Sequence, residues 1–348
     1  PRDGARVSPR MGVPVPTPES HPMMRRQLLA RSAGLAAAAA LPLPLVAQPE
    51  GAITIIVPYA PGGTTDILGR MLAREMAPLL GRTIIVENKP GAGSGVGAAL
   101  VARAPADGNT LLVATSSTLA INPWLYRKLN YNPAKDFAPV GLIGIVPLVV
   151  VVNANSPVRS IADLVPMSKT RPEAMSYGSA GNGSPQHLVA EMFKVATGAH
   201  LTQIPYKGSA PAVADLLGGH IDVMFSDILP ALPHIRAGRL RALAVTSARR
   251  QPALTEVPTV AESGVPGTAG FQGVAWQSLV APAGTPPATV EKYAEALARV
   301  MNQRTLRAQL AADGFEPDTM MPKQLEAYVR AETARWGRVI KASGATVD

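Results

Sequence analysis

The residues best suited to chemistry stand where a strand is expected to run into a helix. Residues 58–66 read PYAPGGTTD, directly after a β-branched run. Gly62 and Gly63 let the backbone turn there, and Thr64 can cap the helix that follows. The free amides of a first helical turn carry partial positive charge, so they bind a carboxylate without Lys or Arg. The alternative interpretation is a tight strand–helix turn in which Asp66 only serves the helix dipole.

A second stretch, residues 177–187, has the same layout and reads YGSAGNGSPQH. Ser184 is expected to cap a helix whose first residue is Pro185. His187 lies one turn into that helix, where it either contacts a ligand or serves as a hydrogen-bonded structural residue. Two helix starts that can bind an anion are more informative together than either one alone.

Two further stretches also follow strands. In residues 204–211, IPYKGSAP, Lys207 either brings a cation to an anionic ligand or is solvated, and Tyr206 either lines a cleft or packs. Residues 114–118, ATSST, form a hydroxyl-rich strand end whose donors suit a polar ligand and suit helix capping nearly as well. Both stretches add polar groups to the predicted binding region.

Enzyme motifs are weak or incomplete in this sequence. Residues 91–98, GAGSGVGA, contain a GxGxxA match, but residues 115–117 are Thr-Ser-Ser where a dinucleotide fold would place an acid. There is no Walker lysine motif, and the His residues after position 47 lack metal-ligand spacing. Ser184 lacks the nucleophile-elbow pattern, and the acids are not obviously paired for acid–base work. We therefore expect no catalytic residue, no metal and no cofactor, and no enzyme activity.

The elements that position these stretches alternate between strand and helix. The first series of expected elements is 53–57, 65–80, 83–86, 96–103 and 110–114. This order predicts a parallel sheet with helices on both faces. An almost continuous apolar run over 140–152, interrupted by Pro147, is interpreted as a strand that crosses from one lobe to another.

A second series and a return to the first lobe complete the predicted fold. The expected elements of that series are 175–179, 184–197, 201–204, 210–217, 221–225 and 240–246. Strand 274–281 leads the chain back, and the helices 288–301, 305–312 and 322–340 are expected to pack on the first lobe. The predicted class is α/β, with two lobes joined by two crossing strands and a ligand cleft between them. Lobe 1 is expected to comprise 48–148 and 275–348, and lobe 2 to comprise 149–274.

The composition narrows the choice of protein class. The chain has 348 residues, of which 47% are apolar and 16% charged, so it can build sizeable cores. It has no Cys, which excludes disulfides and thiolate metal sites. Aromatic residues make up 4%, too few for base-stacking platforms. The net charge is +9, but the part before Gln48 holds six Arg and two acids, which leaves about +5. We therefore expect no nucleic-acid binding.

The N-terminal segment has the order of an export signal. Residues 23–47 run from a basic start through an Ala-rich apolar stretch to a cleavage site after Ala47. The Arg25-Arg26 pair fits a twin-arginine signal and an ordinary Sec signal about equally well. Residues 1–22 are interpreted as a disordered upstream extension, with the true start at Met23 or Met24. The predicted location is periplasmic.

Five stretches taken together resemble the Bug family, the TctC-like extracytoplasmic receptors of tripartite tricarboxylate transporters. They are VPYAPGGTTD at 57–66, ENKPGAGSGVGA at 87–98, YGSAGNGSPQHL at 177–188, PYKGSAPAVADLLGGHIDVMF at 205–225 and LRALAVTSARR at 240–250. The resemblance covers roughly residues 50–345. It implies a type II periplasmic-binding-protein fold, a Venus flytrap that closes around a small solute.

The resemblance also implies what the cleft binds and how. Members typically bind small organic carboxylates, such as di- and tricarboxylates, acidic amino acids or aromatic acids, through backbone amides and hydroxyls. Asp227 becomes a further cleft residue; many relatives have an Asn beside this Asp, where this chain has Ser226 and Ile228. The expected ligand-binding residues are Tyr59, Ala60, Pro61, Gly62, Gly63, Thr64, Thr65, Asp66, Ser116, Ser179, Gly181, Asn182, Gly183, Ser184, His187, Tyr206, Lys207, Gly208 and Asp227.

The resemblance makes the partners of the receptor a small organic acid and membrane transporter subunits. We expect the protein to be a monomer. A ligand sensor that feeds a signalling system is the alternative, and an enzyme acting in the same cleft is a more remote one.

Overall fold

The computed structural model describes residues 51–170 and 175–347. The upstream extension predicted over 1–22 and the signal peptide predicted over 23–47 lie outside these residues. Within them, none of the helices is both long and apolar enough to cross a membrane.

The first lobe is built on the predicted strand–helix alternation. The strand β1 (Ile53–Val57) pairs in parallel with β2 (Ile84–Asn88) on one side and β3 (Thr110–Thr115) on the other. The helix α2 (Thr64–Leu80) connects β1 to β2, and α3 (Gly95–Val101) connects β2 to β3. Apolar side chains recur on one face of α2 at helical spacing and are buried, which holds this helix against the sheet.

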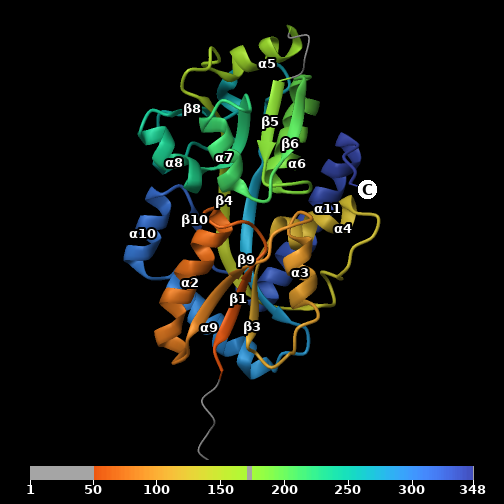
Figure 1. The fold of residues 1–348 in the computed structure, drawn as a ribbon, viewed down its shortest axis with the longest axis vertical. Coiled ribbons are helices and arrows are strands. Elements are labelled where there is room, and N and C mark those ends of the chain that lie inside the picture. The colour runs from red at the N-terminus through yellow and green to blue at the C-terminus, as the bar shows by residue number, and fades with distance from the viewer. Residues whose placement is uncertain (1–50, 171–174, 348) are drawn as a thin grey trace, which may run out of the picture. The chain divides into compact units, whose positions relative to one another are not determined.

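A single long strand joins the two lobes (Figure 1). The strand β4 (Phe137–Asn153) pairs through residues 137–147 with β9 (Val274–Pro282) and through residues 148–153 with β7 (Val223–Asp227) and β8 (Leu240–Val245). Pro147 lies where the pairing changes, opposite Val274. Nearly all of β4 is buried, which explains its almost unbroken apolar sequence.

The second lobe repeats the parallel arrangement. The strand β5 (Met175–Ser179) lies in parallel between β6 (Leu201–Pro205) and β7. The helices of this lobe are α5 (Ile161–Thr170), α6 (Pro185–Thr197), α7 (Ser209–Leu217) and α8 (Ile228–Arg236). The main path through the sheet is β2-β1-β3-β9-β4-β7-β5-β6, so β9 and β4 stand at the centre, and β8 and the short β10 (Glu316–Pro317) pair with β4 off this path. The predicted α/β class with two lobes is therefore confirmed; of the two strands expected to cross, β4 pairs in both lobes, whereas β9 pairs with β3 and with residues 137–147 of β4.

The end of the chain returns to the first lobe. The strand β9 pairs antiparallel with β3 and with the first part of β4. The helix α9 (Pro287–Met301) packs on β4 and α2, and α10 (Arg304–Ala312) follows it. The helix α11 (Pro322–Ser343) contacts β4 and also α6 of the second lobe. Trp276 of β9 and Trp336 of α11 both donate to the buried carboxylate of Glu332, which fixes α11 to the sheet.

Three local details differ from the sequence prediction. The strand expected at 221–225 lies at 223–227, so Asp227 ends it and stands at the N-cap of α8. The helix α8 was not predicted, because its sequence ILPALPHIR contains two prolines; Pro230 falls in the first turn, where no amide donor is needed. The hydroxyl-rich stretch after β3 forms a π-helical turn over Ser117–Ile121 and the short helix α4 (Asn122–Leu125).

Candidate functional site

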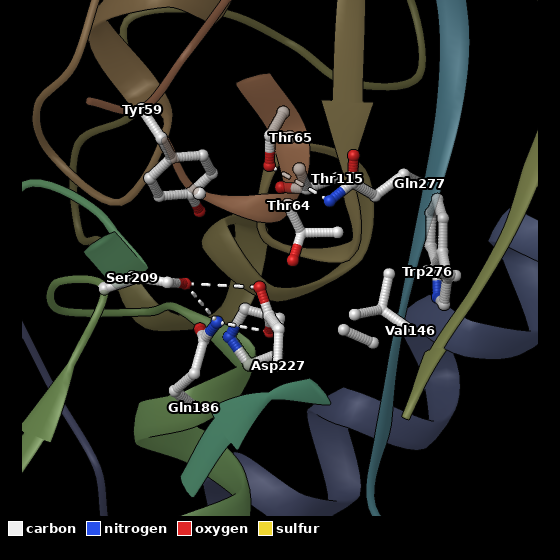
Figure 2. Close-up of a pocket in the computed structure, with 14 residues that line it drawn as sticks. Tyr59, Thr64, Thr65, Thr115, Val146, Gln186, Ser209, Asp227, Trp276 and Gln277 are labelled. Atoms are coloured by element: carbon white, nitrogen blue, oxygen red, sulfur yellow. Dashed lines mark hydrogen bonds between the residues drawn. The ribbon is translucent and has the colours of Figure 1, made fainter. Parts of the chain in front are cut away.

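Four helix starts meet at one cavity between the lobes. The first turn of α2 faces the starts of α6 and α7 across this cavity, and Asp227 reaches it from the N-cap of α8 (Figure 2). The strands β4 and β9 close its remaining side. The residues that line the cavity are Tyr59, Gly63, Thr64, Thr65, Thr115, Val146, Ala180, Pro185, Gln186, Ser209, Asp227, Ala275, Trp276 and Gln277.

The cavity is closed by direct contacts between the lobes. The Ala60 amide donates to the Lys207 carbonyl at 2.9 Å, and the Ser117 hydroxyl donates to the Gly183 carbonyl at 2.8 Å. The Tyr126 hydroxyl donates to the Asn182 carbonyl at 3.3 Å. The enclosed space is about 20 Å³, which is room for a single water molecule. A larger ligand therefore requires the lobes to separate or the lining side chains to move.

The buried carboxyl of Asp227 is the most unusual group in this cavity. Its two oxygens accept hydrogen bonds from Gln186 Nε2 at 2.6 Å and from Ser209 Oγ at 3.2 Å. Gln186 Nε2 also donates to Ser209 Oγ, so the three side chains form one network. Burial raises the pKa of Asp227, and these hydrogen bonds offset the rise only in part. Among the described residues that line the cavity there is no Lys, Arg or His to balance a charge.

Several polar atoms of the cavity have hydrogen-bonding capacity to spare. Thr64 Oγ1, Gln186 Oε1 and Gln277 Oε1 are buried and have no hydrogen-bond partner among the described residues. Figure 2 shows the Thr64 hydroxyl turned towards the Asp227 carboxyl. Gln277 Nε2 donates to Thr65 Oγ1, which places its carbonyl oxygen beside the start of α2. Burying polar atoms without partners is costly, so these atoms are the groups with which a polar ligand would pair.

The start of α2 differs slightly from the prediction, and the difference matters for binding. Its N-cap is Gly63, in an extended conformation, and not Thr64. Thr64 is the first helical residue, so its hydroxyl is not used in capping and faces the cavity. The amides of the first turn have no carbonyl partner within the helix. This turn therefore offers a hydroxyl and several N–H donors to the same small volume.

A second, wider pocket of about 380 Å³ adjoins the closed cavity and shares Tyr59 and Ala180 with it. One side is residues 91–94, where Ala92 and Ser94 have φ values of 46° and 79°, a conformation that non-glycine residues rarely adopt. The other residues that line it are Tyr126, Gly181, Asn182, Pro205, Tyr206, Lys207 and Val347. Lys207 is thus in the outer pocket and away from the closed cavity.

The structure brings nine of the sequence-predicted site residues into these two pockets. Those that line the closed cavity are Tyr59, Gly63, Thr64, Thr65 and Asp227. Those that line the outer pocket are Tyr59 again, Gly181, Asn182, Tyr206 and Lys207. The remaining ones line neither pocket: Ala60, Pro61, Gly62, Asp66, Ser116, Ser179, Gly183, Ser184, His187 and Gly208.

Several of these ten residues support the pocket walls. Ala60 and Gly183 contribute to the contacts between the lobes described above. Ser184 caps α6 as predicted, with its hydroxyl accepting from the His187 amide. The His187 ring accepts from the Gly183 amide, and burial lowers the pKa of His187 to about 4. His187 is therefore a neutral residue that holds the loop before α6.

Asp66 also points away from the closed cavity. It accepts hydrogen bonds from the Gly62 amide, Arg70 and Asn88, and it forms an ion pair with Arg70 at 3.0 Å. Burial raises the pKa of Asp66, but these hydrogen bonds outweigh it and hold the pKa below its usual value. Asp66 is therefore a charged residue that shapes the turn before α2.

Sequence reasoning missed several lining residues. Thr115, Gln186 and Ser209 stand inside the stretches that were singled out, so their positions were visible even though they were not chosen. Trp276 and Gln277 come from the return strand, far away in sequence from the other loops. A glutamine in the middle of the apolar run VAWQSLVAP was the only local signal for that strand.

Comparison with known proteins identifies the family. A family model described as "Tripartite tricarboxylate transporter family receptor" matches residues 68–345. The chain belongs to this receptor family. Among relatives, the Protein BugT of Bordetella pertussis is 37% identical over 315 residues, covering 90% of this chain and 94% of BugT.

Solved structures of the receptor family agree in fold. The Rpa4515 protein of R. palustris with adipate has a TM-score of 0.82 at 37% identity, covering 86% of this chain and 99% of that one. The periplasmic binding protein BugD has a TM-score of 0.81 at 35% identity, with the same two coverages. MatC of Rhodopseudomonas palustris with bound malate has a TM-score of 0.79 at 33% identity, covering 84% and 100%. The two-lobe periplasmic-binding-protein fold is therefore that of the family.

Proposed function

We propose that this receptor binds a small organic carboxylate in the cavity between its lobes and delivers it to the membrane subunits of a tripartite tricarboxylate transporter. The observation that carries the proposal is the convergence of helix starts on a cavity with no basic side chain. Helix starts stabilise an anion through their amides and dipoles. Such a site holds a carboxylate without committing it to a salt bridge, which also permits release.

The solved relatives support a short aliphatic acid as the ligand. Their structures contain adipate and malate, two acids of different length. In this chain the closed cavity and the outer pocket adjoin one another, so once the lobes part, one acid group can reach the start of α2 while the rest of the molecule extends past Tyr59. We propose that the closed cavity is where that acid group binds, with the Thr64 hydroxyl and the free amides of the first turn of α2 as donors.

The remaining elements of the proposal concern where the receptor acts. We propose that it is exported through the Sec or the twin-arginine route and acts as a monomer in the periplasm. Lobe 1 would comprise 48–148 and 275–348, and lobe 2 would comprise 149–274. The lobes would close around the acid, and no chemistry would be done on it.

A thermal-shift screen tests the proposal. The panel consists of adipate, malate, citrate, glutamate and benzoate, with the uncharged diamide of adipic acid as a control of the same shape. An acid present at 100 times its Kd adds about 2.7 kcal/mol of stability, which is readily measured as a rise in Tm. At least one acid should raise Tm while the diamide does not. If the diamide stabilises as well as adipate, the site does not recognise a carboxylate and the proposal fails.

A further inference from the structure

The cavity proposed for an anionic ligand already contains a carboxyl group, and this creates a problem of charge. Of the 14 residues that line it, only Tyr59 and Asp227 carry a group that titrates, and both are acids. A bound carboxylate would therefore lie beside Asp227 with no cationic side chain between them. Two ionised carboxylates in one desolvated site repel each other, and such a pair retains a proton.

We infer that Asp227 binds a proton when the cleft closes on an acid, so that the receptor captures each carboxylate ligand together with one proton. The inference rests on the proposed function, because it assumes that the acid group enters the closed cavity. The proton comes from solvent and lies between the Asp227 carboxyl and the ligand carboxyl. No covalent bond forms or breaks apart from this transfer.

The hydrogen bonds of Asp227 stabilise its charged form too weakly to outweigh the effect of burial on its pKa. A carboxylate that stays ionised in a protein usually accepts backbone amides or an Arg, as Asp66 does from Gly62 and Arg70. Asp227 accepts hydrogen bonds from the side chains of Gln186 and Ser209, and the nearby Thr64 hydroxyl also lowers its pKa. None of the hydrogen bonds between described residues joins a backbone amide to its carboxyl. It stands at the N-cap of α8, yet its side chain makes no capping bond there and points into the cavity.

The elements packed around Asp227 bring no compensating charge to it. Tyr59, which precedes α2, donates its hydroxyl hydrogen to Ser117, and burial raises the pKa of this phenol. In α6, His187 is held neutral by burial, with a pKa of about 4. The strands β4 and β9 contribute Val146, Ala275, Trp276 and Gln277 to the cavity.

The charged groups of the helices around Asp227 have other partners. In α2, Asp66 pairs with Arg70. In α7, Asp215 accepts a hydrogen bond from Tyr206 at 2.6 Å. In α8, His234 contacts Arg239 on the exposed side. The charge of the cavity is thus set by Asp227 and by the ligand.

Calorimetry in buffers of different ionisation enthalpy tests the inference, with adipate, malate and benzoate as probes. Binding of one molecule of acid to the receptor should be accompanied by the uptake of one proton from solvent. The Kd of the acid should rise about tenfold per pH unit between the pKa of Asp227 in the free receptor and the higher pKa in the complex. Asp227→Asn keeps the shape of the side chain and the hydrogen bond from Gln186. This variant should bind the acid without proton uptake, and its Kd should no longer rise with pH. At high pH it should therefore bind the acid more tightly than wild type. Glu256→Gln removes an exposed acid of the second lobe and should leave proton uptake unchanged.

Three outcomes would overturn the inference, and they are distinguishable. If an acid binds wild type without proton uptake, Asp227 does not take part in this way. If Asp227→Asn loses affinity at every pH while its melting curve stays cooperative, the Asp227 carboxyl contributes to binding in a way other than proton uptake, and the inference is wrong. If none of the acids binds at any pH, the proposed function itself fails, and the inference falls with it.

Discussion

A disulfide across the closed cleft gives the sharpest test of how this receptor works. A Cβ atom placed on Gly63 of the first lobe would lie 3.7 Å from the Cβ of Ser209 in the second. Disulfides join Cβ atoms that are about 3.5–4.5 Å apart, so the pair Gly63→Cys and Ser209→Cys is suitably placed. Gly63 has an ordinary extended backbone, with φ of −84°, so a side chain there is not strained. The chain has no other Cys, which makes the bond unique.

The stabilisation expected from this disulfide depends on the length of the chain between the two cysteines. Residues 63 and 209 enclose a loop of roughly 146 residues, for which the chain-entropy relation gives about 5 kcal/mol of stabilisation. Both forms of the double variant lack the Ser209 hydroxyl, so the loss of its bond to Asp227 cancels in the comparison. The oxidised form should therefore melt well above the reduced form.

The decisive measurement is ligand association in the two redox states. The reduced double variant should bind an acid from the panel, and the oxidised form should not admit it, because the closed cavity has room for only one water molecule. Adding a reductant should restore binding. The single variants Gly63→Cys and Ser209→Cys, treated identically, show what each substitution does alone. If the oxidised form binds as fast as the reduced form, the lobes need not separate and the flytrap account is wrong.

Three further predictions follow from particular contacts. Thr64→Val should weaken acid binding, measured by calorimetry, by about 1–3 kcal/mol and leave the Tm of the free protein unchanged. Lys207→Ala in the outer pocket should change the Kd less. If Lys207→Ala has the larger effect, a Lys–carboxylate ion pair holds the acid instead. Gly93→Ala would place a Cβ against the Asn182 carbonyl of the other lobe and should hold the lobes apart, which solution scattering would show as a larger radius. Gly81→Ala is the matched control, because Gly81 has a similar φ and open space around it. Burial lowers the pKa of His187 to about 4, so the neutral ring contributes fully to stability above pH 6.5 and this contribution is lost as the pH falls towards 4. Urea denaturation at pH 5 should show a free energy of unfolding about 2 kcal/mol lower than at neutral pH. His187→Gln should lack this pH-dependent decrease.

Much of the fold could be predicted because local signals agree with the tertiary structure. The bounds of β1 and β5 match the prediction to the residue, since a β-branched or small-residue run ends at a proline or glycine turn in each case. Ser184 was predicted as a cap and is one, because Ser followed by Pro at a helix start has a single favourable arrangement. The crossing strand β4 was visible as an apolar run longer than one sheet requires.

The candidate site was less accessible to prediction, for reasons that are not local. Gln277 reaches the start of α2 only because β9 pairs with β3 and β4, and its hydrogen bond to Thr65 joins residues 212 positions apart. Asp227 was expected two residues beyond the end of its strand, and only the observed register places it at the N-cap of α8. That Thr64 faces the cavity depends on Gly63 taking the capping position, a shift of one residue that composition does not determine.

The hydrogen bonds that close the cleft also make the lobes competitors of the ligand. Ala60 and Ser117 bind the main-chain carbonyls of Lys207 and Gly183 directly, so the protein can shut without cargo. A receptor molecule that is closed and empty cannot admit an acid. The apparent Kd is therefore the Kd of the open form divided by the fraction of receptor that is open. Where the acid keeps these groups apart, a variant such as Ser117→Ala would capture acid more tightly, because it removes a bond that only the empty cleft makes. Affinity in such a receptor is set as much by how poorly the empty cleft closes as by how well the full one does.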